Sequence, residues 1–222
     1  MNSLSTPSLH LVTSRARLAP DARTTREQVS ALDAQIEAAI AAGVDIIQIR
    51  ERDLAAGLLL GLVERAVACA IGTPTRIIVN ERADVAAAAG ASGVHLPASG
   101  LPATRVRALS AAWMVGRSTH VGEHPRDVDA VDYVLFGTVF PSESKQPGSQ
   151  VAGLGALAAA VRAFACPVIA IGGLTPDRAG ECLRVGAAGV AAIGAFLPPG
   201  RARDALGVET AVSAFRAAMP GA

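Results

Sequence analysis

Short apolar runs alternate with longer segments of helical spacing along the whole chain. The runs are rich in Val, Ile and Leu, which is typical of buried parallel strands. In the first longer segment Val29, Leu32, Ile36 and Ile40 share one helical face, and Gly43 follows as a stop signal. The pattern therefore predicts strand–helix units that repeat from one end of the chain to the other.

Eight such units are predicted in the 222 residues. The predicted strands cover residues 8–13, 45–50, 76–80, 93–96, 113–118, 132–136, 167–171 and 189–193. The predicted helices cover residues 26–42, 55–70, 82–89, 102–109, 125–130, 154–164, 177–185 and 208–219. A polar loop is expected over residues 15–25, before the first helix.

Eight evenly spaced units favour an α/β fold of the (β/α)8 TIM-barrel type. The length suits a single domain over residues 1–222, with flexible tails expected at 1–7 and 220–222. A doubly wound open sheet is the alternative, but that fold usually carries its glycine-rich turn after the first strand. Here the glycine turns follow the last two predicted strands, which favours the barrel.

The two glycine turns indicate a phosphate site. The run 167–171 leads into Gly172 and Gly173, and Thr175 and Pro176 suit the first turn of the next helix. The run 189–193 also stops at a glycine. Glycine lets backbone N–H groups approach an anion closely, and the loops after the last two strands of a barrel are its usual phosphate site.

The composition of the chain limits the kinds of partner that it is expected to bind. Half of the residues (51%) are hydrophobic and only 3% are aromatic, while the formal net charge is +1. This balance gives no reason to expect nucleic acid or a membrane surface as a partner. Cys69, Cys166 and Cys182 are far apart and are expected to be buried thiols, since their spacing suits no zinc site. With no signal-like segment at the start, these features predict a cytoplasmic protein.

Polar residues collect where the predicted strands end, which is where active sites lie in this fold. Gln48 and Arg50 are two residues apart in one strand and share a face, so both would point into the barrel mouth. A guanidinium there needs an anion, or else an ion pair with Glu51 or Glu81. The other candidates at strand ends are Arg52, Asn80, Ser118, His120, Ser142, Ser144 and Lys145. The last three lie in a long polar loop, 137–153, which is expected to be a lid or disordered.

Seven motifs in this order resemble the thiamine phosphate synthase family, which includes the TenI-type thiazole tautomerases. They are Gln48–Arg52, Val79–Asp84, Gly93–Leu96, Gly116–His120, Phe136–Pro141, Ser142–Lys145 and Ala170–Gly173. The resemblance extends over residues 9–196, nearly the whole chain. Each motif alone is weak, whereas seven in register are specific.

The resemblance implies a coupling of two phosphorylated substrates. Hydroxymethylpyrimidine diphosphate loses diphosphate with the help of Mg²⁺, and the nitrogen of a thiazole phosphate captures the resulting cation. The residues that would surround the pyrimidine diphosphate are Gln48, Arg50, Arg52, Asn80, Ser142, Ser144 and Lys145. The thiazole phosphate would lie on Gly172, Gly173, Ile193 and Gly194. Among the residues around the pyrimidine diphosphate, Arg50 and Lys145 would act in catalysis. Ser118 would lie beside the reacting centre. Self-association is also common in the family.

Two departures from the family pattern concern the metal and one phosphate. The family holds Mg²⁺ with two aspartates, but here Glu81 takes the first position and residues 97–102 contain no acid. Mg²⁺ can still bind one carboxylate together with substrate phosphates and waters. The family serine in the last phosphate loop is replaced by Gly194.

Two other functions stay open at this point. A thiazole tautomerase has no diphosphate to expel, and His120 would then be its general acid or base. A sensor that binds thiazole phosphate without turnover would need no metal. His10 and His95 lie within predicted strands and are expected to be buried, hydrogen-bonded packing residues.

Overall fold

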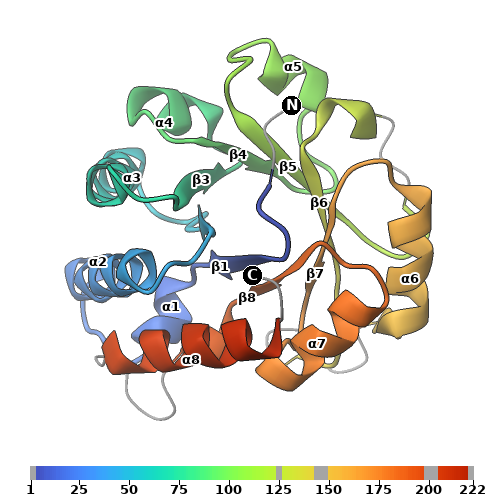
Figure 1. The fold of residues 1–222 in the computed structure, drawn as a ribbon. Helices are drawn as coiled ribbons and strands as arrows, with labels where there is room; N and C mark the ends of the chain where they lie inside the picture. Colours follow the sequence, from blue (N-terminus) through green and yellow to red (C-terminus); the bar gives the residue numbers. More distant parts are fainter. Residues whose placement is uncertain (1–3, 124–126, 143–149, 198–204, 220–222) are drawn as a thin grey trace.

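The chain forms a closed barrel of eight parallel strands surrounded by helices (Figure 1). The computed structural model describes residues 4–123, 127–142, 150–197 and 205–219. The strands are β1 (Ser8–Val12), β2 (Ile46–Ile49), β3 (Arg76–Asn80), β4 (Gly93–Leu96), β5 (Met114–Thr119), β6 (Tyr133–Gly137), β7 (Val168–Ile171) and β8 (Gly189–Ala192). Each strand pairs with the next one in the sequence, and β8 pairs with β1. The predicted TIM-barrel fold is confirmed, and an open doubly wound sheet is excluded.

The helices follow the predicted order, with differences at three places. They are α1 (Arg15–Leu18), α2 (Thr25–Ala41), α3 (Ala56–Ala70), α4 (Ala83–Ala88), α5 (Ala103–Arg107), α6 (Gly153–Ala163), α7 (Pro176–Arg184) and α8 (Ala205–Ala218), with 3-10 turns η1 (Val128–Ala130) and η2 (Gly194–Phe196). The polar loop expected over residues 15–25 contains α1, so that prediction was wrong in part. The helix expected over 125–130 is only the turn η1 in its described part, and η2 was not predicted.

Helix starts follow the chemistry of their caps. The side chain of Thr24 accepts a hydrogen bond from the N–H of Glu27 at 3.2 Å, which begins α2. Thr175 likewise caps α7, with Pro176 in the first turn, as the sequence predicted. The outer faces of the strands pack against these helices in one apolar cluster that includes Leu32, Leu62 and Phe215. No helix in the described part of the chain is long and apolar enough to cross a membrane.

Two smaller expectations concern the thiols and the tail. Cys166 and Cys182 are buried as expected, but Cys69 is exposed, because it lies on the outer side of α3. Of the tail expected at residues 1–7, only 4–7 are described. Leu4 packs against the apolar residues of the barrel interior, and the Ser5 hydroxyl donates to Asp45 at 3.0 Å.

The barrel interior contains a polar layer between apolar ones. The rings of His10 and His95 both lie against the ring of Tyr133, with centroids 5.4 and 5.8 Å away. His10 bonds the Ser8 hydroxyl at 3.0 Å, and His95 bonds Tyr133 and Ser118. Burial lowers the pKa of His10 to about 4 and that of His95 to about 3. Both histidines are therefore neutral, hydrogen-bonded packing residues at neutral pH, as predicted.

Closure of the barrel depends on a glycine in β8. A Cβ atom at Gly189 would overlap the carbonyl oxygen of Ser8 in β1. We expect Gly189→Ala to lower the free energy of unfolding by about 1–3 kcal/mol, because overpacking of a close backbone contact forces the strands apart. Urea denaturation measures this change. Gly57→Ala in α3 is the control, since a Cβ there meets nothing within 4 Å. It should be neutral or stabilising; equal destabilisation by both variants would contradict the role of Gly189.

The buried histidines predict a pH dependence of stability. In the unfolded chain both titrate near pH 6.5, whereas in the folded chain they stay neutral to about pH 4 and about pH 3. Between these values the unfolded state binds more protons, so stability is complete above pH 6.5 and falls as the pH falls. We expect the double substitution of His10 and His95 by Asn to flatten the dependence of the urea midpoint on pH between about 4.5 and 6.5. The ion-paired carboxylates Asp53 and Asp84 lose their contributions at lower pH. An unchanged slope would contradict the assignment.

Candidate active site

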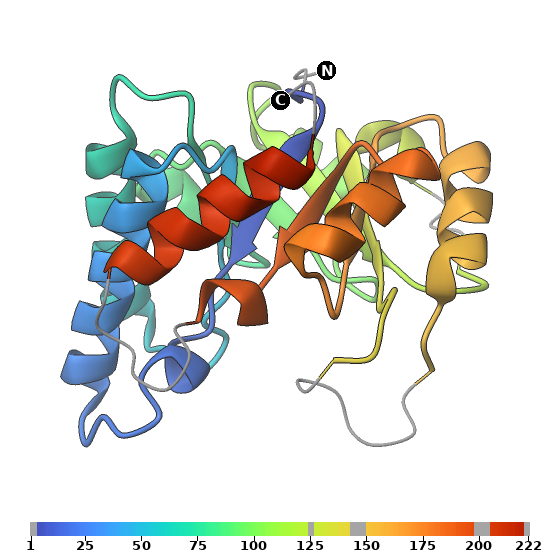
Figure 2. The same cartoon turned by 60° about the horizontal axis from the view of Figure 1, so that its bottom comes forward.

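The polar residues predicted at strand ends lie at one end of the barrel wherever the structure describes them. All eight strands are parallel, so their carboxyl ends open at the same rim. In Figure 2 the strands run toward the lower end of the view, where α1 and the described parts of the loops after β6 and β8 also lie. This rim therefore carries both the arginines that follow β2 and the glycines that follow β7 and β8.

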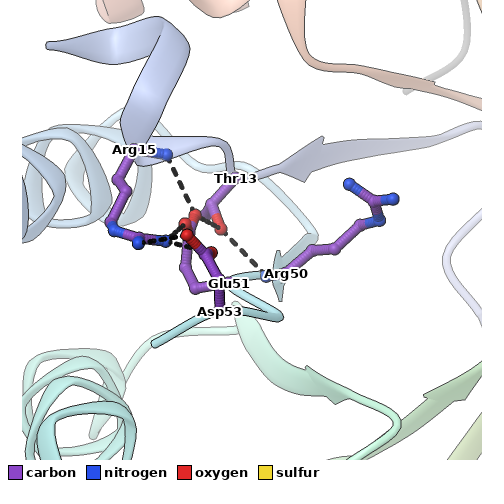
Figure 3. Close-up of polar contacts among 5 residues, drawn as sticks. All are labelled: Thr13, Arg15, Arg50, Glu51 and Asp53. Carbon is purple, nitrogen blue, oxygen red and sulfur yellow. Dashed lines mark hydrogen bonds and ion pairs between the residues drawn. The ribbon is translucent and has the colours of Figure 1, made fainter. Parts of the chain in front are cut away.

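Arg50 presents an uncompensated positive charge to the mouth. Its guanidinium makes no hydrogen bond or ion pair with any described residue, although the side chain is half-buried. Figure 3 shows it extending away from the neighbouring charged residues. Burial, and then repulsion by Arg52, holds the pKa of Arg50 below its ordinary value. The ion pairs with Glu51 or Glu81 that were the alternative for Arg50 are not formed in the structure.

Glu51 has a different partner, which fixes the loop that follows β2. Its buried carboxylate accepts hydrogen bonds from the Thr13 hydroxyl at 2.8 Å, from the Arg15 N–H at 3.1 Å and from Arg15 Nη1 at 2.9 Å. Arg15 also binds both oxygens of Asp53 at 2.7 Å, which is the first cause of its raised pKa. The Thr13 hydroxyl in turn accepts from the N–H of Arg50 at 2.9 Å (Figure 3). These bonds position the backbone from which Arg50 extends.

A chain of polar side chains links β2 to β3. Gln48 Nε2 donates to Asn80 Oδ1 at 3.2 Å, and Asn80 Nδ2 donates to Glu81 Oε2 at 2.9 Å. Glu81 is also 3.0 Å from Nε of Arg52. The backbone of Glu81 has φ of 63°, a left-handed conformation that is strained for a residue other than glycine. Four residues predicted for the site, Gln48, Arg52, Asn80 and Glu81, are therefore brought together, and their contacts help to hold Glu81 in its strained conformation.

The donor set at this rim suits Mg²⁺ only with help from a substrate. The described residues contain no group of three or more His, Cys, Asp or Glu side chains that could hold a metal ion. Asp84 is bound to Arg82 at 2.6 Å, which lowers its pKa to about 2, so it does not join Glu81. The loop of residues 97–102 has no acid, and the buried guanidinium of Arg117 binds its carbonyl oxygens. Glu81 with phosphate oxygens and waters matches the way Mg²⁺ is usually bound.

The hydroxyl of Ser118 is held in place by the neutral side chain of His95. The Nε2 atom of His95 lies 2.8 Å from Ser118 Oγ, and its Nδ1 atom lies 3.3 Å from the Tyr133 hydroxyl. Sequence reasoning treated His95 as a packing residue and missed its contact with Ser118. The two residues lie on neighbouring strands, where Leu96 pairs with Arg117. The pairing of these two neighbouring strands was the signal from which the contact between His95 and Ser118 could have been predicted.

His120 is exposed at the end of β5 with one nitrogen fixed. Its Nδ1 lies within hydrogen-bond distance of the carbonyl oxygen of Gly137, which can only accept, so Nδ1 carries the proton. The N–H of His120 donates to Glu123 at 2.9 Å. The Nε2 atom has no partner among the described residues. This geometry suits a group that exchanges protons.

The glycine turn after β7 is shaped by the loop after β6. Gly172 and Gly173 have φ of 102° and 63°, which favours glycine. A Cβ at Gly172 would overlap Thr138, and one at Gly173 would overlap the carbonyls of Phe140 and Pro141. The N–H of Gly173 finds no acceptor in the described part of the chain. The turn is therefore a tight, uncharged backbone surface.

The remaining predicted site residues have mixed outcomes. Ile193 lies between β8 and η2, and Gly194 begins η2 at the same rim. Ser142 is half-buried at the end of the described loop after β6. Ser144 and Lys145 lie outside the described residues, as does the whole stretch 143–149 of the loop expected to be a lid. The sequence prediction missed Thr13 and Arg15, because their contacts join distant segments.

Comparisons with known proteins agree with this site. A family model described as thiamine monophosphate synthase matches residues 22–196. A putative thiamine-phosphate synthase from Geobacter sulfurreducens is 38% identical over 192 residues, which are 82% of this chain and 90% of the relative. A thiamine-phosphate synthase from Anaeromyxobacter dehalogenans is 41% identical over 167 residues, covering 74% and 75% of the two chains.

A solved structure supports the same assignment. The thiamine phosphate pyrophosphorylase of Pyrococcus furiosus superposes with a TM-score of 0.77 at 26% identity, over 96% of this chain and 95% of that one. The order of motifs, the barrel and the two parts of the rim lead to one family. The chain belongs to the thiamine monophosphate synthase family.

Proposed function

We propose that the protein is a thiamine-phosphate synthase that couples hydroxymethylpyrimidine diphosphate with thiazole phosphate and releases diphosphate. The observation that carries the proposal is the uncompensated, half-buried guanidinium of Arg50 at the same rim as the glycine turns. A cation buried without a partner is costly unless an anion binds it. Two different anion sites at one rim suit two phosphorylated substrates.

The diphosphate would bind on the side of β2 and β3. Arg50 and Arg52 supply charge there, and the Gln48–Asn80 pair supplies amide donors. The family resemblance implies that Ser142, Ser144 and Lys145 would also contribute to this proposed site. The C–O bond to the diphosphate breaks with both electrons leaving on the diphosphate, and the thiazole nitrogen then forms the new C–N bond. Fixed positive charge favours the step because it binds the leaving group more strongly as its charge develops.

The reacting carbon would lie over Ser118. His95 is neutral, so it can either donate to Ser118 Oγ or accept from it, depending on its tautomer. When His95 donates, the hydroxyl proton of Ser118 is turned toward the mouth and can bond the departing oxygen. The phosphate of the thiazole would lie on Gly172, Gly173, Ile193 and Gly194, whose backbone carries no net charge.

Glu81 would hold Mg²⁺ together with oxygens of the bound diphosphate. The ion would neutralise charge on the leaving group. In the structure the carboxylate of Glu81 is shared between Asn80 and Arg52, so the same contacts hold Arg52 beside the proposed diphosphate site. The cytoplasmic location and the self-association predicted above remain predictions.

One pair of assays separates this function from its alternatives. The purified protein is incubated with the pyrimidine diphosphate, thiazole phosphate and Mg²⁺, and thiamine phosphate is measured; isomerisation of the carboxylated thiazole phosphate is followed separately. Thiamine phosphate formation supports the synthase. Isomerisation alone would point to His120 and a tautomerase. Binding of thiazole phosphate without either product would leave a sensor.

Removal of the Arg50 guanidinium should strongly reduce the rate of the coupling reaction. We expect Arg50→Ala to lower kcat/KM for the pyrimidine diphosphate by about 10²–10³-fold, the usual cost of losing one preorganised group that stabilises developing charge. Arg50→Lys should recover part of the loss, because it keeps the charge but not the two-pronged geometry. The control is Arg65→Ala, which breaks an exposed ion pair with Asp33 on the outer helices. Similar rates for Arg50→Ala and Arg65→Ala would sink the assignment.

The carboxylate of Glu81 should set the Mg²⁺ requirement. We expect Glu81→Gln to raise the half-saturating Mg²⁺ concentration in the coupling assay by about tenfold or more, since an amide is a weaker ligand for a hard cation. Asp84→Asn is the matched control, because that carboxylate is already bound to Arg82. The proposal about Glu81 fails if the two variants depend on Mg²⁺ in the same way as the parent protein.

A further inference from the structure

The carbonyl groups in the turn after β7 do not alternate in direction. In a regular strand, successive carbonyls point toward alternate neighbouring strands. Here the carbonyl of Ile171 accepts a hydrogen bond from the N–H of Val139 at 2.9 Å. The next carbonyl, that of Gly172, accepts from the N–H of Phe140 at 3.0 Å. Both donors belong to the segment after β6, so two successive carbonyls face the same side. The φ of 102° at Gly172 permits this change of direction.

The third carbonyl of the turn is held by a side chain. Arg178 lies in α7, on the outside of the barrel next to α8 (Figure 1). Its Nη1 atom donates to the carbonyl of Gly173 at 2.6 Å. The same guanidinium lies over the ring of Phe140, with its carbon 4.9 Å from the ring centroid. Arg178 therefore joins α7 to the turn after β7 and to the segment after β6.

The bound carbonyls fix the directions of the N–H groups that follow them. A trans peptide is planar, and its carbonyl and N–H point in opposite directions. The bond to the carbonyl of Gly172 thus orients the N–H of Gly173, and the bond to the carbonyl of Gly173 orients the N–H of Leu174. Neither N–H has an acceptor in the part of the chain that the structure describes. Because Phe140 follows β6 on one side of β7, the N–H of Gly173 points toward the other side, where β8 and Gly194 lie.

Arg178 also places a positive charge behind this turn. It forms no ion pair with a carboxylate among the described residues. A hydrogen bond from a charged donor is stronger than one from a neutral donor, and it polarises the group that accepts it. The N–H of Leu174 belongs to the peptide that Arg178 polarises, so it becomes a better donor. Successive N–H groups without acceptors form a concave surface that suits an anion.

We propose that Arg178 is a positioning residue that directs the N–H of Leu174 to an oxygen of the thiazole phosphate. The identity of the ligand rests on the proposed function. Leu174 adds a backbone donor to those of the glycines after β7 and β8. Arg178 acts through the peptide between Gly173 and Leu174, because its Nη1 atom bonds the side of that peptide opposite the N–H. The N–H of Gly173 is oriented by backbone bonds alone and does not depend on Arg178.

Direct binding tests the positioning role. The parent protein and Arg178→Met are titrated calorimetrically with thiazole phosphate, without the pyrimidine substrate and without Mg²⁺. Methionine keeps an unbranched apolar side chain against Phe140 but cannot donate to the carbonyl of Gly173. We expect Arg178→Met to weaken binding by about tenfold, the usual effect of losing one hydrogen bond to a charged group. Arg178→Lys should recover part of the affinity, because its ammonium group can still donate.

The matched control for this titration is Arg184→Met at the last residue of α7, which should bind thiazole phosphate like the parent. Equal affinity of the parent and Arg178→Met would overturn the proposal.

Amide NMR separates positioning from direct contact and from a general loss of structure. In the parent protein, thiazole phosphate should shift the amide protons of Gly173 and Leu174 downfield, as expected for N–H groups that bond an anion. In Arg178→Met at saturating ligand, the shift should be lost at Leu174 and kept at Gly173, because Phe140 still holds the preceding carbonyl. Any other pattern, including loss or retention of both shifts, would contradict the positioning role.

The coupling assay keeps this proposal distinct from the proposed function. Arg178→Met should raise KM for thiazole phosphate and leave KM for the pyrimidine diphosphate unchanged; an equal rise in both would reject the role of Arg178. Binding of thiazole phosphate that needs Arg178, with no thiamine phosphate formed, supports the positioning role and rejects the synthase. Thiamine phosphate formation with an unchanged KM in the variant rejects only the role of Arg178. No binding of thiazole phosphate to the parent protein would reject both.

Discussion

The pairing of β1 with β8 is the constraint on which the site depends. Ser8 pairs with Gly189 and Leu11 pairs with Ala192, so the last strand closes on the first. An open sheet would leave the arginines after β2 far from the glycines after β8. Closure makes β1 a bridge between them, because β2 lies on one side of it and β8 on the other. The close approach that closure needs is the reason for a glycine at position 189.

Ion pairing decides which cations at the rim remain available to a ligand. Arg15 and Arg117 are buried, and both are neutralised, by Glu51 and by Asp127. Removing a charge from water is tolerable only with such partners, and these pairs serve mainly to fix loops. Arg50 has no such partner among the described residues, although Glu51 is its neighbour in sequence. The carboxylate of Glu51 therefore fixes the loop after β2, and the guanidinium of Arg50 stays available to bind an anion.

The sequence predicted the elements well because their signals are local. The predicted bounds of β3 and β4 agree with the structure residue for residue, since a short apolar run between polar or small residues defines each of them. The helix α1 was missed because its four residues have no amphipathic repeat, and its anchor, Glu51, lies 36 residues away. Contacts of that kind form only in the assembled barrel, so they produce no periodic pattern in the sequence.

The same distinction applies to the site. Gln48, Asn80 and Arg50 could be placed at one rim because parallel strands put their ends together. One further inference was available, since successive residues at a strand end point to opposite faces and Glu51 could not easily reach the guanidinium of Arg50. The partner that Glu51 binds instead lies in α1, a helix that the sequence did not predict. The charge left at the mouth is thus a property of the fold, although each residue that creates it is visible in the sequence.

The missing acid in the loop of residues 97–102 follows the same electrostatic logic. That loop is held from below by the guanidinium of Arg117, which binds the carbonyls of Pro97, Ala98 and Leu101. The charge of Arg117 is offset by Asp127, so the loop is held by a paired guanidinium and carries no carboxylate of its own for a cation. In the proposed function, positive charge for the departing diphosphate would instead come from Arg50 and Arg52, which follow β2, two strands away from β4 in the barrel. In that arrangement fixed side chains would contribute a larger share of the stabilisation than in a site built around two aspartates, because their charge is present before the substrate binds.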